Sequence, residues 1–247
     1  GNLFNNITGT PGNDNLAGGP LADLISALAG DDILTGNGGD DTLDGGLGSD
    51  TANYDTAPGS VIVDLLNQIS AGAAGNDTLT SIENAIGSNF ADDIFGDNNS
   101  NNLQGLGGND DIFGRGGDDT LDGGQGRDYV YGGAGDDTLI LTPDAQNDYY
   151  YGEGGIDLLD LSSSPVSYFV DLDFYTSFGQ ARAASPTTID LIYSMENILG
   201  TDFNDTLNGN SGVNEIDGGD GDDNIDGAGG DDILTGGNGS DTLFGGG

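Results

Sequence analysis

A nine-residue pattern, G-G-x-G-x-D-x-U-x with U a large apolar residue, recurs eighteen times along this chain of 247 residues. Five copies occupy 9–53, eight occupy 87–160 around a two-residue insertion, and five occupy 200–244. Column six of the pattern is Asp in 16 of the 18 copies, and column eight is Leu, Ile or Val in 16. Two different residue types held at fixed columns exclude low-complexity drift and predict a solenoid of stacked units.

Each column of the repeat suits a separate structural task. Glycine tolerates positive φ, so columns one, two and four predict a tight turn whose carbonyl oxygens point inward. Such oxygens and an Asp carboxylate are ligands that calcium prefers, because this hard cation takes six to eight oxygens. Columns seven to nine predict a short strand that buries its column-eight side chain. The side chains expected in this core are Leu34, Leu43, Ile94, Leu103, Ile112, Leu121, Val130, Leu139, Leu207, Ile216, Ile225, Leu234 and Leu243.

Units such as GNGGDDTLD at 36–44, GRGGDDTLD at 114–122 and GGAGDDTLI at 132–140 resemble the calcium-binding nonapeptide of the RTX (hemolysin-type) family. The resemblance implies an all-β fold, a parallel β-roll like the modules of serralysins and mannuronan C-5-epimerases. Two nonapeptides then make one coil, turns on the same side recur every eighteen residues, and calcium lies between them. It also implies about a dozen Ca²⁺ ions, each with backbone oxygens from columns two and four and a side-chain oxygen from column six.

Carried onto this chain residue by residue, the resemblance nominates two sets of ligands. The side-chain ligands of column six are Asp14, Asp23, Asp32, Asp41, Asp50, Asp92, Asn101, Asp110, Asp119, Asp128, Asp137, Asp148, Asp157, Asp205, Asn214, Asp223, Asp232 and Asp241. The glycines nominated for backbone ligation are Gly39, Gly48, Gly108, Gly117, Gly126, Gly133, Gly135, Gly219, Gly221, Gly230, Gly237 and Gly239.

Two spacers, 54–86 and 161–199, interrupt the repeats and are copies of each other. Alternating apolar residues around 61–65 and 168–172 predict a strand in each copy. The string SIENAIG at 81–87 resembles the segment that enters the calcium β-roll of serralysins, and 194–200 repeats it as SMENILG. That resemblance implies carbonyl ligands at Ser81 and Ser194 and carboxylate ligands at Glu83 and Glu196. The alternative is that both Glu side chains only cap a solvated strand end.

Composition excludes several classes of function. The chain has 43 Asp plus Glu against 3 Lys plus Arg, a formal net charge of −40, which disfavours nucleic acid and anionic membrane surfaces. No apolar run approaches the length of a membrane span. Without His or Cys, neither a zinc-binding H-E-x-x-H helix nor a His-based triad can form, so we expect no enzyme activity.

Charge and glycine content also predict how folding depends on metal. So acidic a chain, with two modest apolar side chains buried per coil, is expected to stay disordered until a cation binds. Calcium is scarce in cytoplasm and abundant outside, so we expect a secreted, extracellular or cell-surface protein. Type I secretion from a bacterium is what the family resemblance implies. A first residue other than Met, and an end where another repeat would begin, favour a fragment of a longer protein.

An aromatic strip is the feature that the calcium motif does not explain. Alternate repeats of the second array place aromatic side chains in columns seven and nine, which face outward on one sheet: Phe95, Phe113, Tyr129, Tyr131, Tyr149 and Tyr151. They form a candidate binding surface for a glycan or another protein; the alternative is that a spacer folds over them. Three function classes stay open: a structural, adhesin or S-layer-like segment, an accessory module of a secreted epimerase, protease or lipase, and a glycan-binding module.

Overall fold

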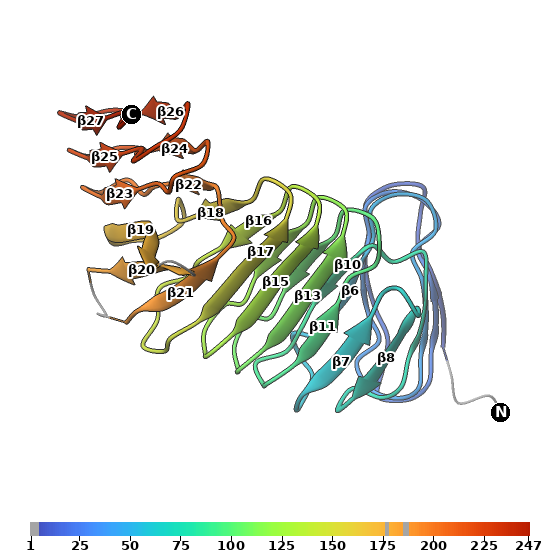
Figure 1. Cartoon of the computed structure of the whole chain (residues 1–247). Coiled ribbons are helices and arrows are strands. Elements are labelled where there is room, and N and C mark those ends of the chain that lie inside the picture. Colours follow the sequence, from blue (N-terminus) through green and yellow to red (C-terminus); the bar gives the residue numbers. More distant parts are fainter. Residues whose placement is uncertain (1–4, 176–177, 185–187) are drawn as a thin grey trace.

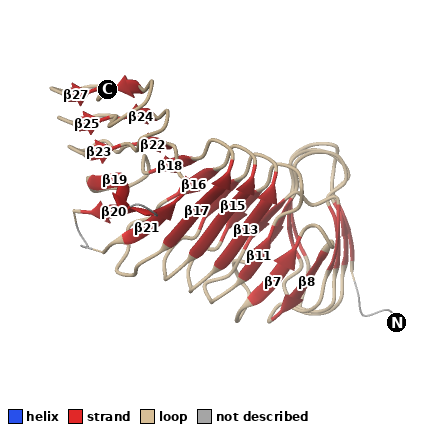
Figure 2. Ribbon diagram, in the orientation of Figure 1, coloured by secondary structure: helices blue, strands red, loops and turns tan. Residues whose placement is uncertain are grey.

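The computed structural model describes residues 5–175, 178–184 and 188–247, and in these ranges the chain is all strand, turn and loop with no helix. Figures 1 and 2 show short strands stacked coil upon coil into a β-solenoid, with the N-terminal coils at one end and β27 at the other. Two sheets, of sixteen and eleven strands, form the two walls. The predicted fold class, a parallel β-roll, is confirmed.

The sixteen-stranded sheet contains β1, every second repeat strand and three strands from each spacer. Its strands, in spatial order, are β1 (Asn6–Thr8), β3 (Leu24–Ser26), β5 (Thr42–Asp44), β9 (Thr78–Thr80), β8 (Ile69–Gly72), β7 (Val61–Asp64), β11 (Asp93–Phe95), β13 (Asp111–Gly116), β15 (Tyr129–Ala134), β17 (Tyr149–Gly154), β21 (Asp190–Tyr193), β20 (Phe178–Ala183), β19 (Tyr168–Tyr175), β23 (Thr206–Asn208), β25 (Asn224–Asp226) and β27 (Thr242–Phe244).

The eleven-stranded sheet contains the intervening strands and is parallel throughout. In order these are β2 (Asn15–Ala17), β4 (Ile33–Thr35), β6 (Thr51–Asn53), β10 (Asn84–Ile86), β12 (Asn102–Gln104), β14 (Thr120–Asp122), β16 (Thr138–Ile140), β18 (Leu158–Asp160), β22 (Asn197–Leu199), β24 (Glu215–Asp217) and β26 (Ile233–Thr235).

Strand register confirms that two nonapeptides make one coil. Ile112 of β13 pairs with Val130 of β15, and Leu103 of β12 pairs with Leu121 of β14, eighteen residues apart in both cases. The two-residue insertion at Leu141 and Thr142 is absorbed in one turn, and the register beyond it is restored with an offset of twenty.

Each spacer widens one sheet and leaves the other uninterrupted. β7, β8 and β9 pair antiparallel within the sixteen-stranded sheet, as do β19, β20 and β21. On the other wall β6 pairs directly with β10, and β18 with β22. The strands predicted at 61–65 and 168–172 are therefore confirmed as β7 and β19. Because extra strands enter only one wall, the stack bends, and Figure 1 shows the coils of β23 to β27 lying at an angle to the central coils.

The column-eight side chains form the core between the two walls. From Leu34 to Ile225 every one of those predicted to be buried is inaccessible to solvent. The prediction fails at the C-terminal end, where Leu234 is partly buried and Leu243 is 42% exposed. No later coil in the described chain packs over these two strands, so their inner faces lack the neighbour that buries the others.

The two positive-φ columns of the turn tolerate different residues. Where φ is positive at column two it lies between +64° and +110°, and six of these positions hold a non-glycine residue. Column four has φ between +102° and +153° and is glycine wherever φ is positive, because a Cβ there would overlap the backbone of the preceding coil. This contact, rather than turn formation alone, explains why column four is glycine wherever its φ is positive.

Replacing Gly126 with Ala tests this backbone contact. Gly126 has φ +133°, and a Cβ would overlap the carbonyl oxygen of Gly108. We expect Gly126→Ala to lower the free energy of unfolding of the calcium-loaded protein by about 3 kcal/mol or more, from strain and steric clash together. Gly116→Ala is the matched control, since its Cβ would lie 3.6 Å from the nearest atom. Equal denaturant midpoints for the two variants would contradict the assignment.

Candidate metal centres

The column-six side chains form two rows along the solenoid. The first row precedes the strands of the sixteen-stranded sheet, and the second row precedes those of the eleven-stranded sheet. At every column-six Asp except Asp14, the Oδ1 atom accepts a hydrogen bond from a backbone N–H of the preceding coil. Asp128 Oδ1 lies 2.9 Å from the nitrogen of Asp110, and Asp137 Oδ1 lies 2.8 Å from that of Asp119. One carboxylate oxygen is therefore used by the fold itself.

The second carboxylate oxygen has no partner at ten of these positions. The buried, unbonded Oδ2 atoms belong to Asp32, Asp41, Asp50, Asp110, Asp119, Asp128, Asp137, Asp157, Asp223 and Asp232. Burial and the neighbouring carboxylates raise the pKa of Asp110 to about 8 and that of Asp119 to about 7. Buried, unpaired anionic oxygens in a row are costly unless a cation binds them.

Backbone carbonyl oxygens also lie close to these unpaired Asp Oδ2 atoms. A Cβ on Gly105, in column one, would fall within 3 Å of both Asp110 Oδ2 and the carbonyl oxygen of Gly123 in the next coil. Only glycine leaves this space open between a carboxylate and a carbonyl. The carbonyl oxygen of column one is thus a candidate calcium ligand that the sequence analysis missed. Those of columns two and four face the next coil, as Leu28 O faces Gly46 and Gly30 O faces Gly48.

Calcium fits this donor set of hard oxygens. In the ranges that the structure describes, no three acidic side chains converge on one point. A cation held here would therefore combine one carboxylate of a coil with carbonyl oxygens of adjacent coils. The glycines nominated from the sequence line these turns, while their part in ligation stays a prediction.

Each spacer contributes one glutamate to the second row. Glu83 Oε2 accepts from the nitrogen of Asp50 at 2.9 Å, and Glu196 Oε2 accepts from that of Asp157 at 3.0 Å. The carbonyl oxygen of Ser81 and Asp50 Oδ2 both face the Cα of Gly45. Glu83 therefore takes the place of a column-six residue in the row, and the Ser81 carbonyl lies beside the unpaired oxygen of Asp50. Ligation of calcium by these two residues stays a prediction. Ser194 stands in the same relation to Asp157 at Gly152.

Two members of the first row were missed by the sequence analysis. Asp77 Oδ1 accepts from the nitrogen of Asp41 at 2.9 Å, and Asp190 Oδ1 accepts from that of Asp148 at 3.1 Å. The signal was present as N-D-T-L at 76–79 and I-D-L-I at 189–192, which match columns five to eight of the repeat. Both lie inside spacers. Asp77 keeps glycines in columns one and four, at Gly72 and Gly75, whereas the residues before Asp190 include no glycine in 185–189. Asp77 Oδ2 is bonded by the hydroxyl groups of Tyr54 and Ser70, at 3.0 Å each.

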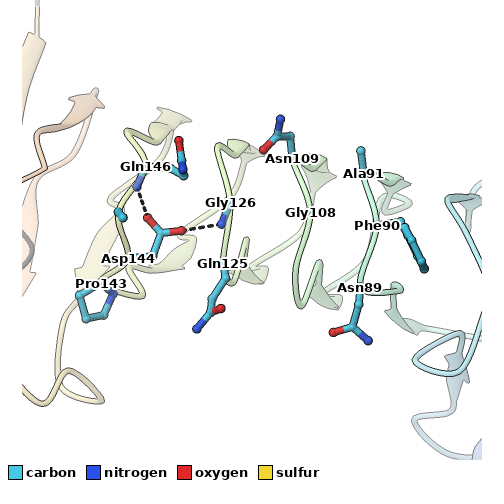
Figure 3. A pocket seen from close by; sticks show the side chains of 11 residues that line it. Asn89, Phe90, Ala91, Gly108, Asn109, Gln125, Gly126, Pro143, Asp144 and Gln146 are labelled. Atoms are coloured by element: carbon cyan, nitrogen blue, oxygen red, sulfur yellow. Dashed lines mark hydrogen bonds between the residues drawn. The ribbon is translucent and has the colours of Figure 1, made fainter.

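Asp148 follows a turn of different construction. Pro143 to Asn147 lacks the glycines of the repeat, and Asp144 takes over part of their role. Its carboxylate accepts from the nitrogens of Gly126 and Gln146, at 2.6 Å each (Figure 3). Elsewhere a carbonyl of the next coil accepts from the column-four N–H, as Gln125 O does for Gly108. At this turn a side-chain carboxylate therefore accepts the hydrogen bond that a backbone carbonyl accepts in the other coils.

The aromatic strip is a ladder of stacked rings. Phe95, Phe113, Tyr131 and Tyr151 stack in sequence with centroids 4.6–5.0 Å apart, and Tyr193 of the second spacer adds a fifth ring at 4.5 Å. Tyr129 and Tyr149 stack beside them at 4.6 Å. In the described part of the spacers, β7 and β21 lie beside the strip, as neighbouring strands of the same sheet. The rings are half-buried by one another, so their edges, not their faces, point to solvent.

These features define a class: an all-β solenoid whose turns present rows of oxygen ligands suited to calcium. The family model of the RTX calcium-binding nonapeptide repeat (4 copies) matches residues 1–20, 17–52, 86–121, 104–139, 199–234 and 222–247, which together exceed half of the chain. The chain therefore belongs to the RTX calcium-binding nonapeptide repeat family. Among curated proteins none matches it in sequence. Within the described residues, no helix is long and apolar enough to cross a membrane.

Proposed function

We propose that this chain is a calcium-dependent structural region of a secreted bacterial protein, which folds when it meets calcium outside the cell. The observation that carries this proposal is the set of ten buried, unpartnered Asp oxygens in two rows. Without a cation they make the coil stack self-repelling, and with one they bind adjacent coils together. The number of such oxygens supports about ten ions, somewhat fewer than the dozen expected from repeat counting.

The proposed structural role is at the cell surface, as an adhesin or S-layer-like segment. It agrees with a continuous solenoid in which hydrogen bonds and ring stacking join each coil to the next. The aromatic ladder supports the same role. Stacking of this kind contributes about 0.5–1.5 kcal/mol for each pair beyond burial, and it uses the ring faces that a sugar would need. This argues against the glycan-binding alternative based on ring stacking. An accessory role beside a secreted enzyme uses the same solenoid, and the sequences flanking this region would separate the two.

Calcium counting tests the proposal. We expect the purified chain to bind about ten ions by equilibrium dialysis, and Asp119→Asn to bind one fewer, because an amide cannot replace the anionic Oδ2. Asp118→Asn is the matched control, since this exposed neighbour only accepts a hydrogen bond from the nitrogen of Asp136, which an amide oxygen can also accept. A protein that binds no calcium, or an Asp118 variant that loses as much as the Asp119 variant, would refute the assignment.

A further inference from the structure

Six column-six residues, at the first two repeats of each array, differ from the rest. Their second oxygen, or for Asn the single amide oxygen, accepts a hydrogen bond from the N–H of column two in the same turn. The pairs, donor first, are Thr10 to Asp14 at 2.5 Å, Gly19 to Asp23 at 2.5 Å, Ser88 to Asp92 at 2.5 Å, Asp97 to Asn101 at 2.7 Å, Thr201 to Asp205 at 2.7 Å and Asn210 to Asn214 at 2.9 Å. The backbone thus satisfies these oxygens without a metal.

Backbone conformation at column two separates the two kinds of turn. In all ten turns with an unpaired Asp Oδ2, column two has positive φ, at Leu28, Asn37, Gly46, Leu106, Arg115, Gly124, Gly133, Glu153, Gly219 and Ala228. None of the six self-bonded turns has positive φ there. Reversing the sign of φ turns the column-two N–H away from the carboxylate and leaves Oδ2 for another partner.

Side chains complete the self-bonded turns with hydrogen-bond donors. Asn101 Nδ2 donates to the carbonyl oxygen of Glu83 at 2.7 Å, and Asn214 Nδ2 donates to that of Glu196 at 2.6 Å. The hydroxyl of Ser88 donates to Asp92 Oδ1 at 2.9 Å. An amide N–H that donates to a carbonyl oxygen occupies the position that a cation bound to that oxygen would need. This explains why column six is Asn at these two positions, where it had appeared only as an exception to Asp.

The positions of these turns divide the unpaired carboxylates into three groups. In the second row, Asp50 is followed by Glu83 and Asn101 before the next unpaired carboxylate, Asp119. Strands lie about 4.8 Å apart, so three steps separate Asp50 from Asp119 by about 14 Å. That interval is about three times the spacing between neighbouring carboxylates within a run. Asp157 and Asp232 are separated in the same way by Glu196 and Asn214.

We propose that these six turns are metal-free closures, which divide the calcium positions into three runs that load independently. This proposal rests on the proposed calcium function, and in it six column-six residues close their turns by hydrogen bonding instead of binding calcium. The runs lie in 27–53, 105–160 and 218–235, each preceded by two closed turns. Calcium binding then orders each run outward from the two closed turns that precede it, whether or not the other two runs hold calcium.

Converting a closure into a calcium turn tests the assignment. In the triple variant Asp97→Gly, Asn99→Gly, Asn101→Asp the turn at 96–101 becomes G-G-N-G-S-D, the sequence of a calcium turn. We expect this variant to bind one ion more than the wild type in equilibrium dialysis. Asn101→Ala, which removes the donor but adds no ligand, should leave the ion count unchanged. A loss of one ion in Asn101→Ala, or no gain in a triple variant that keeps its sheet circular dichroism, would overturn the proposal.

Hydrogen exchange during calcium titration tests the independence of the runs. Asp119→Asn should raise the calcium midpoint for amide protection in 105–160 about threefold or more, while the midpoints for 27–53 and 218–235 stay within error. A common shift in all three segments would refute the division into runs while leaving calcium binding itself in place. A chain that gains no protection at any calcium concentration would instead refute the proposed function.

Discussion

In a calcium chelator at pH 8 the chain is expected to lose its β-sheet circular dichroism and its cooperative melting transition. Ten buried carboxylate oxygens then face one another along two rows with no counter-charge. Each coil contributes only about two buried apolar side chains, Leu121 and Val130 for example, against the entropy of ordering a glycine-rich turn. Repulsion and chain entropy together exceed this burial, so the metal-free chain unfolds.

Restoring calcium should restore the sheet signal, and magnesium at the same concentration should not. Magnesium demands a compact octahedral shell and releases its water reluctantly, whereas the spaces beside Gly105 and Gly114 offer carbonyl and carboxylate oxygens fixed by the coil spacing. Monovalent salt screens exposed charges but binds no Oδ2, so it should recover little structure. Cooperative melting of the chelated chain near the transition of the loaded protein would contradict the calcium dependence argued for this fold.

The repeat made the regular part of this fold predictable, because each column has one physical cause. Column eight predicted the buried residues from Leu34 to Ile225, and the pairing of two nonapeptides predicted the register of eighteen. At Leu243 the pattern continues while the neighbouring coil that would bury it is missing from the described chain. A local pattern predicts that a side chain points inward, but the side chain is buried only if a neighbouring coil packs over it.

The closures could not be predicted from column six alone, because Asp has the same identity in both kinds of turn. Asp92 and Asp110 are equivalent in the repeat, yet Ser88 N–H bonds one of them and the other has a free oxygen. Every turn with a free Asp Oδ2 has positive φ at column two and glycine at column four. Gly12 and Gly212 lie in closed turns, so glycine at column four does not open a turn by itself. Phe90 and Phe203 stand in column four of closed turns, where positive φ would strain them. These were the available signals, and they lie in the turn before column six.

The spacers were predicted as strands but not as insertions into a single wall. Alternation of apolar residues around β7 predicted the strand, while the pairing of β6 with β10 depends on contacts distant in sequence. Tyr193 extends the aromatic ladder for the same reason, because β21 pairs with β17 across a long spacer. Nothing local marks a residue that becomes a neighbour only through such a crossover.

Lowering the pH in chelator is expected to recover the fold that calcium removal destroys. In the metal-free fold, burial and neighbouring carboxylates raise the pKa of Asp110 to about 8 and that of Asp119 to about 7. Asp128 and Asp137 rise to about 6 for the same main reason, burial. The unfolded chain has ordinary values near 4. Between pH 8 and pH 5 the fold therefore binds more protons than the unfolded chain, and its stability increases as pH falls.

Circular dichroism of the chelated chain between pH 8 and pH 5 measures this effect. The sheet signal should return as the pH falls, and Asp110→Asn should need less acid, because its buried carboxylate no longer has to be protonated. The calcium-loaded protein should respond in the opposite sense, since protons compete with calcium for the same oxygens and weaken its binding. If the chelated chain shows equal ellipticity at pH 8 and pH 5, repulsion between these rows is not what keeps the metal-free solenoid from forming.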